Sequence, residues 1–179
     1  MKKHRDLEKL FAKHGFADFK WIGSEGIVVA QWVRMKCMFG CSSFGKSACC
    51  PPNVPSVAEC RRFFNEYHAV AIFHFEKSVK KPGDRAPWAR RINETLLKLE
   101  RDVFLSGYHK AFLLFMDSCR ICADCQSART ECKNPRRARP APEAMAVDVF
   151  STARRCGYPI EVLEDYSQRM NRYAFLLVE

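Results

Sequence analysis

The stretch AFLLFMDSCRICADCQSARTECKNP, residues 111–135, joins a short apolar run to a cysteine-rich segment, and the rest of the chain is read outward from it. Cys119, Cys122 and Cys125 follow one another with two residues between each, and six residues separate Cys125 from Cys132. A tightly wound loop with a thiolate at every third residue can cap several iron corners of an iron–sulfur cluster. A zinc site needs only two cysteines from one turn. The spacing therefore favours an iron–sulfur loop, with zinc as the alternative.

A second cysteine group lies earlier in the chain, with the pattern C-x3-C-x7-C-C-P-P. Cys37, Cys41 and Cys50 are candidate ligands of a second cluster, and Cys49 is a possible fourth. Successive side chains alternate in an extended chain, so we expect only one of the adjacent pair to bind metal, and we favour Cys50 because Pro51 holds it extended. An open fourth position would let the metal act on a substrate, whereas a filled one would allow only electron transfer. The sequence leaves this choice open, and with it the question of whether the protein is an enzyme.

Hydrophobic periodicity predicts a single α/β domain over residues 1–179, built on a mixed, largely parallel sheet of about five strands flanked by helices. Both cysteine groups follow predicted strands, so we expect the two metal loops to meet at the carboxyl edge of the sheet. Glu143 is expected to serve a helix N-terminus, and Cys60 and Cys156 to be inert thiols within helices. The predicted helices cover residues 5–14, 55–67, 88–103 and 142–156, and the strands 26–35, 69–75, 111–116, 159–163 and 173–178.

Composition and charge narrow the class of protein. The charged N-terminus leads into no apolar stretch, and no run is long enough to span a membrane, so we expect a cytoplasmic protein with no membrane partner. Ten cysteines in such a chain indicate metal or redox chemistry rather than disulfides. The formal charge is +10, but eight thiolates around two four-iron cores would reduce it to about +6. Part of the basic excess therefore balances sulfur charge, and a nucleic-acid partner is not the favoured reading.

Taken together, the two cysteine motifs resemble those of a poorly characterised family of bacterial and archaeal cysteine-rich predicted metal-binding proteins. The run from Ala138 to Val149 strengthens the resemblance. It implies a metal, most simply in iron–sulfur form, without naming a reaction. Cys49 stands where the resemblance suggests a small non-ligand residue, and Ala146 where it suggests glycine. The ligands it implies are Cys37, Cys41, Cys50, Cys119, Cys122, Cys125 and Cys132.

These observations predict a protein with two iron–sulfur clusters, both of the 4Fe-4S type, that transfers electrons to or from a redox partner protein or supports a partner enzyme. One alternative is an iron–sulfur enzyme that uses an open iron at the site formed by Cys37, Cys41 and Cys50. Another is a zinc-stabilised module that binds nucleic acid through its basic surface. The sequence names neither a substrate nor an oligomeric state.

Overall fold

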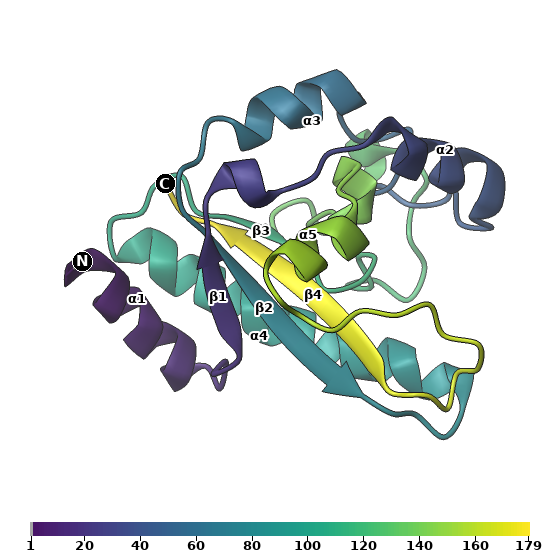
Figure 1. Ribbon diagram of the computed structural model, residues 1–179. Coiled ribbons are helices and arrows are strands. Elements are labelled where there is room, and N and C mark those ends of the chain that lie inside the picture. Colours follow the sequence, from purple (N-terminus) through teal and green to yellow (C-terminus); the bar gives the residue numbers. More distant parts are fainter. Residues whose placement is uncertain (1) are drawn as a thin grey trace.

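A four-stranded antiparallel sheet forms the centre of the protein, seen in a computed structural model that describes residues 2–179 (Figure 1). The strands lie in the order β1-β2-β4-β3. β4 pairs with β2 along its whole length, from Leu177 opposite Val70 to Met170 opposite Lys77, and with β3 on its other side. The strand bounds are β1 Phe19–Ile22, β2 Val70–Lys77, β3 Phe112–Leu114 and β4 Met170–Leu177.

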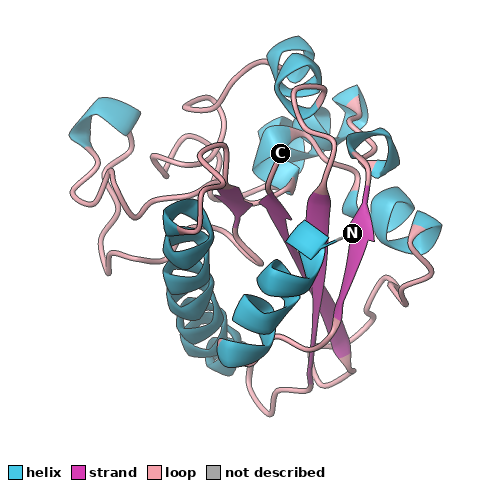
Figure 2. Cartoon of the chain, turned by 90° about the vertical axis from the view of Figure 1, so that its left-hand side faces the viewer, coloured by secondary structure: helices cyan, strands magenta, loops and turns pink. Residues whose placement is uncertain are grey.

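Helices cover both faces of the sheet (Figure 2). Successive side chains of a strand point to opposite faces, so β2 contributes to two cores. Ala71 and Phe73 pack on the side of α1 (Lys2–Lys13) and α4 (Arg85–Leu105), while Val70 and Ile72 pack on the side of α3 (Val57–Phe64) and α5 (Val149–Arg155). The predicted helices at 5–14, 55–67 and 88–103 and the predicted strands at 69–75, 111–116 and 173–178 are confirmed in these elements, with shifts at their ends.

The predicted parallel, five-stranded sheet is wrong. The β2–α4–β3 connection does return β3 in the direction of β2, because both are antiparallel to β4. However, the C-terminal strand β4 occupies the place between them, which makes every neighbouring pair antiparallel. Residues 159–163 form no strand, and β1 was not foreseen. Pairing between segments about 100 residues apart leaves no trace in local periodicity, so the adjacency of β2 and β4 could not be read from the sequence.

The predicted strand at 26–35 is also wrong, since α2 (Gln31–Gly40) occupies its second half. Residues 27–30 make only an isolated bridge, between Val29 and Val147. Gln, Arg, Lys and Met favour helix, and the apolar run that resembled a strand arises because the outer face of this helix is itself apolar. Trp32, Met35, Met38 and Phe39 are exposed, while Val33 is the buried residue of α2.

The predicted helix at 142–156 is divided into two short elements. The 3₁₀ helix η4 (Glu143–Met145) ends at Ala146, which has a left-handed φ of 60°. α5 then starts afresh with Asp148 as its cap, whose side chain accepts from the Ser151 amide. Two further 3₁₀ helices, η1 (Ser24–Gly26) and η2 (Pro82–Asp84), precede α2 and α4, and η3 (Arg129–Glu131) lies within the second cysteine loop. Among residues 2–179 no helix combines the length and apolarity needed to cross a bilayer.

Candidate metal centre

The first two cysteines are positioned by α2. Cys37 lies in the last turn of this helix and Cys41 directly follows it, so their four-residue spacing places them on one side of the helix end. Both line a pocket of about 530 Å³ between α2 and the segment that contains η4. Burial, followed by the neighbouring Cys41, raises the pKa of the Cys37 thiol, and Glu143 adds to the rise. The two thiols and the Glu143 carboxyl are therefore electrostatic neighbours.

Cys49 and Cys50 lie in a tightly turned loop after α2. The Gly45 amide donates to the Pro51 carbonyl at 3.0 Å, and the Cys50 amide donates to the Ser47 carbonyl at 3.1 Å. Gly45 has a φ of +71°, a conformation that favours glycine. Cys49 is buried and Cys50 is half-buried. The loop thus holds two adjacent thiols in different surroundings, as expected for successive side chains.

The second cysteine segment follows β3 and is held by α4. Asn93 of α4 accepts the Met116 amide at 3.0 Å, and Arg90 donates to the Ile121 carbonyl at 3.2 Å. An ion pair of 2.9 Å joins Arg85 and Asp117 at the start of the loop. The buried Asn93 and the more exposed Arg85 and Arg90 supply partners for the end of the edge strand and for the loop that follows, so α4 fixes where the cysteines begin.

The two cysteine segments lie against each other, although about 70 to 80 residues separate them in sequence. Arg129 of the second segment reaches the Cys49 sulfur at 3.9 Å and donates to the Pro135 carbonyl of its own segment at 3.1 Å. The Asn53 amide group donates to the Ser127 carbonyl. Ser47 and Cys125 approach to 3.9 Å between oxygen and sulfur. The meeting of the two loops that the sequence suggested is therefore present, although the first loop leaves a helix and not a strand.

A pocket of about 420 Å³ opens between the two segments and the start of α4. Thiols from both segments line it, together with three cations that offset negative sulfur charge. The cysteines are Cys50, Cys119, Cys122 and Cys125, and the cations are Lys46, Arg90 and Arg120.

The thiols of Cys49 and Cys119 form a pair whose pKa values are shifted in opposite directions. The Cys49 thiol donates to the Cys119 sulfur, and this bond is the largest cause that lowers the pKa of Cys119 to about 6. Backbone amides of Ile121 and Arg139 and the charge of Arg129 also favour the thiolate, while burial opposes it. The same bond raises the pKa of Cys49. Elsewhere in the centre, the Asn134 amide group donates to the Cys122 sulfur at 3.1 Å.

The chemistry of the donors fits a thiolate-bound metal, but their positions do not form a closed ligand set. All ten cysteines are free thiols. Among residues 2–179, no three Cys, His, Asp or Glu side chains converge in a way that would hold a metal ion. Metal binding would therefore have to draw the loops together, as is common for sites that complete on binding. Of the predicted ligands, Cys41 and Cys125 are exposed, Cys49 is buried, and Cys37, Cys50, Cys119, Cys122 and Cys132 are half-buried.

Two cysteines lie outside the centre, as the sequence suggested. Cys60 is fully buried in α3, where its sulfur contacts the Pro55 carbonyl at 3.6 Å. Cys156 caps the end of α5.

Glu143 does begin a helix, the 3₁₀ helix η4, but its position beside Cys37 and Cys41 was not predicted from the sequence. Its carboxyl faces the pocket that Cys37 and Cys41 line and is reached by solvent there. The surrounding protein nevertheless desolvates the group and raises its pKa. The only signal was its place in the run from Ala138 to Val149, which periodicity could not distinguish from a helix N-terminus.

A comparison with protein families gives one match: the family model described as "Predicted metal-binding protein (DUF2284)" matches residues 20–178. No curated protein and no solved structure shows significant similarity to the chain.

Proposed function

The chain belongs to this family of predicted metal-binding proteins, and from that premise we propose that it is an iron–sulfur protein that transfers electrons. One observation carries the proposal: cysteines from two remote segments line one concavity that also contains three cations. Thiolates are the ligands of iron–sulfur clusters, and nearby positive charge stabilises the reduced form. The seven cysteines expected as ligands remain candidates. Cys49 is also a candidate, and because it contacts Cys119 it would join the ligands of the second segment although it lies in the first.

Each part of the centre has a role in this proposal. A cluster, when bound, supplies reversible one-electron chemistry. The cysteines hold it, Lys46, Arg90 and Arg120 favour added negative charge, and the Asn134 amide group donates to a ligand sulfur. Hydrogen bonds to ligand sulfurs raise the potential of such centres. We place this chemistry in the cytoplasm, because thiol ligands must remain reduced.

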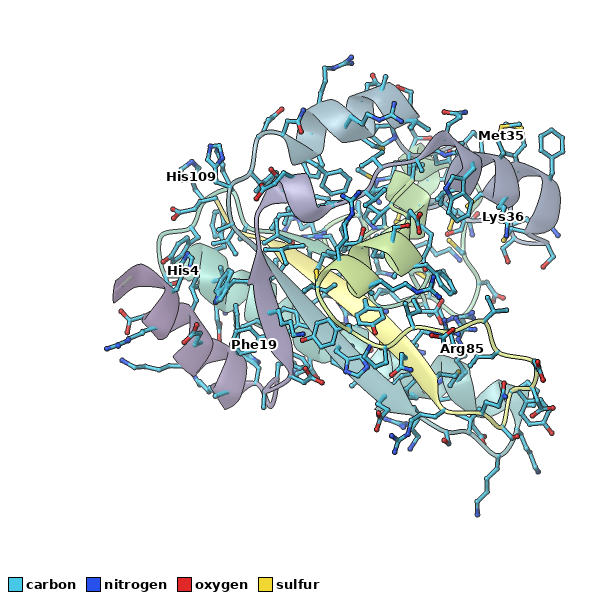
Figure 3. All side chains as sticks on the ribbon, viewed as in Figure 1. His4, Phe19, Met35, Lys36, Arg85 and His109 are labelled. Atoms are coloured by element: carbon cyan, nitrogen blue, oxygen red, sulfur yellow. The ribbon has the colours of Figure 1, made fainter. Side chains whose placement is uncertain are left out.

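A partner protein is part of the proposal, and α2 offers the surface for it. Four large apolar side chains of this helix are exposed, including Phe39 at 78%, and Met35 points away from the molecule (Figure 3). Exposed apolar groups gathered on one helix mark interaction sites, and methionines adapt to varied surfaces. The helix also carries the exposed cation Lys36 and leads to Cys41, so we propose an acidic redox protein as its occupant.

The partner proposal is tested by the rate at which the metal-loaded protein exchanges electrons with an acidic one-electron carrier. We expect the rate to fall with added salt, and to fall further when Phe39 is replaced by serine. A salt-independent rate, or binding of the helix to anionic lipid vesicles instead, would contradict it.

Anaerobic purification followed by metal and sulfide analysis tests the main proposal. We expect a brown protein that contains iron and acid-labile sulfide in equal amounts, with broad absorption bleached on reduction. Replacement of Cys119 or Cys122 by serine should remove most of this absorption, whereas replacement of the buried Cys60 by serine should leave it intact. A colourless protein that contains zinc would replace the electron-transfer proposal by a structural zinc site.

A further inference from the structure

A carboxylate stands next to two of the candidate metal ligands in the pocket between α2 and η4. Cys37 and Cys41 line the pocket from α2, and Glu143 lines it from η4. The remaining wall includes the aromatic residues Trp32 and Phe150 and the charged residues Lys36 and Asp148.

The Glu143 carboxyl is open to solvent at this pocket. Among residues 2–179 its carboxylate makes no side-chain hydrogen bond and no ion pair of 4.0 Å or less. Arg85 and Arg172 act on it from a distance, but Arg85 is already paired with Asp117. A solvent-reached carboxylate without an ion-pair partner is available as an oxygen ligand to a metal bound beside it.

The backbone around Glu143 is firmly held. The Val147 amide donates to the Pro142 carbonyl at 3.0 Å, and the Ala30 amide donates to the Ala146 carbonyl at 2.9 Å. Arg34 of α2 donates to the Ala144 carbonyl at 3.0 Å. η4 and α2 are thereby fixed to each other, and the carboxylate is presented to the cysteines by a rigid element, as a pre-positioned ligand requires.

Cys49 does not complete the first set of thiols. It is directed to Cys119 and lies near Arg129 and Cys132, all of the second segment. Cys50, by contrast, interacts electrostatically with both Cys37 and Cys41. The first set is therefore three thiols without a fourth sulfur.

We propose that Glu143 supplies the fourth, oxygen ligand of the metal held by Cys37, Cys41 and Cys50. This inference rests on the proposed metal-binding function and refines it, because it makes the first site chemically different from an all-cysteine site. Oxygen is a harder ligand than thiolate and a poorer match for iron–sulfur or other soft-ligand centres. The first site is thus the more exchangeable one, and it faces a pocket with room for a small molecule.

Replacement of Glu143 by glutamine and by cysteine tests this assignment. Glutamine keeps the size of the side chain and removes the charged oxygen ligand, whereas cysteine offers a thiolate from the same position. We expect Glu143→Gln to lose the spin-resonance signal of one site, with iron per chain falling by up to roughly half if two similar clusters are bound. Glu143→Cys should restore the iron content with an altered spectrum. Glu131→Gln, an exposed carboxylate beside Cys132, is the matched control and should behave as the wild type.

The outcomes separate this inference from the proposed function. Normal metal loading of the wild type together with an unchanged spectrum and iron content in Glu143→Gln overturns the inference alone. If Glu143→Gln does not fold, as judged by circular dichroism, the cysteine variant decides: a folded Glu143→Cys with unaltered spectrum overturns it too. A wild-type chain that binds neither iron nor zinc overturns both proposals. If the protein binds zinc, the same variants are compared after zinc has been replaced by Co²⁺. The visible absorption bands of Co²⁺ then report whether the oxygen ligand is lost.

Discussion

Cys49 and Cys50 are adjacent in sequence but serve different sides of the centre. Cys49 donates to Cys119 of the remote segment, whereas Cys50 faces Cys37 and Cys41 as well as the pocket between the segments. Alternation of side chains explains why the two point apart. From the sequence we expected only one of Cys49 and Cys50 to bind metal. In the structure each of the two lies with a different set of thiols.

The Cys49–Cys119 contact predicts unusual reactivity in the metal-free protein. Because the pKa of Cys119 is lowered to about 6, its thiolate is present above that pH, and alkylation by iodoacetamide should reach half its plateau rate near pH 6. Replacement of Cys49 by alanine removes the largest cause of the shift, so the midpoint should move upward, toward the ordinary thiol value. Peptide mass spectrometry after timed alkylation measures this midpoint at Cys119.

Cys60→Ser is the matched control for that experiment. Its sulfur is buried in α3 and does not contact the centre, so the Cys119 midpoint should stay unchanged. A midpoint that is the same in wild type and Cys49→Ala would show that the thiol pair does not control Cys119.

At the scale of elements, two segments differ from their sequence reading because contacts with distant parts decide them. α2 resembled a strand because its apolar residues face outward, whereas only Val33 is buried. The helix expected at 142–156 breaks because Ala146 and Asp148 are drawn into backbone hydrogen bonds with Ala30 and Val28. Neither partner is visible in a local window of sequence.

The left-handed Ala146 predicts a sharp response to substitution. Its φ of 60° and complete burial leave no room for a β-branched side chain. Ala146→Val should therefore lower the free energy of unfolding by roughly 2–4 kcal/mol, from backbone strain and overpacking together. Ala146→Gly should be nearly neutral, because relief of strain is offset by loss of a buried methyl group. Urea denaturation of the metal-free proteins measures both values; a loss below about 1 kcal/mol for valine would contradict the turn as described.

At the scale of the whole molecule, the sequence predicted the components better than their arrangement. The helices α1, α3 and α4 and the strands β2, β3 and β4 follow from periodicity. The cysteine loops do meet, but the expectation rested on a parallel sheet with a strand before each loop, and the first loop follows the helix α2. The order of strands does not follow from periodicity, because it depends on the C-terminal strand inserting between β2 and β3. Glu143 likewise gains its place from the packing of η4 against α2, which no spacing rule describes.

The separation of core and cysteine loops predicts how the protein responds to loss of metal. Both hydrophobic cores are built on the sheet and its helices, and of the second cysteine loop only Ile121 and the partly buried Cys119 pack into them. Metal removal should therefore leave the sheet folded, with amides of β2 and β4 protected from hydrogen exchange. Residues 41–56 and 118–138 should lose protection, because thiolate–metal bonds no longer hold the two segments together.

Hydrogen exchange with mass spectrometry, before and after treatment with a chelator, measures this difference segment by segment. Metal-loaded Cys60→Ser should retain protection of both loops, whereas Cys122→Ser should lose it even with metal present. Stabilisation by a ligand grows with the logarithm of its concentration over its dissociation constant, so a tightly held metal should raise the melting temperature as well. As a set, the thiols of the two segments are too far apart to hold a metal unless the segments close around it. If both loops exchanged equally with and without metal, the metal would therefore have to bind elsewhere.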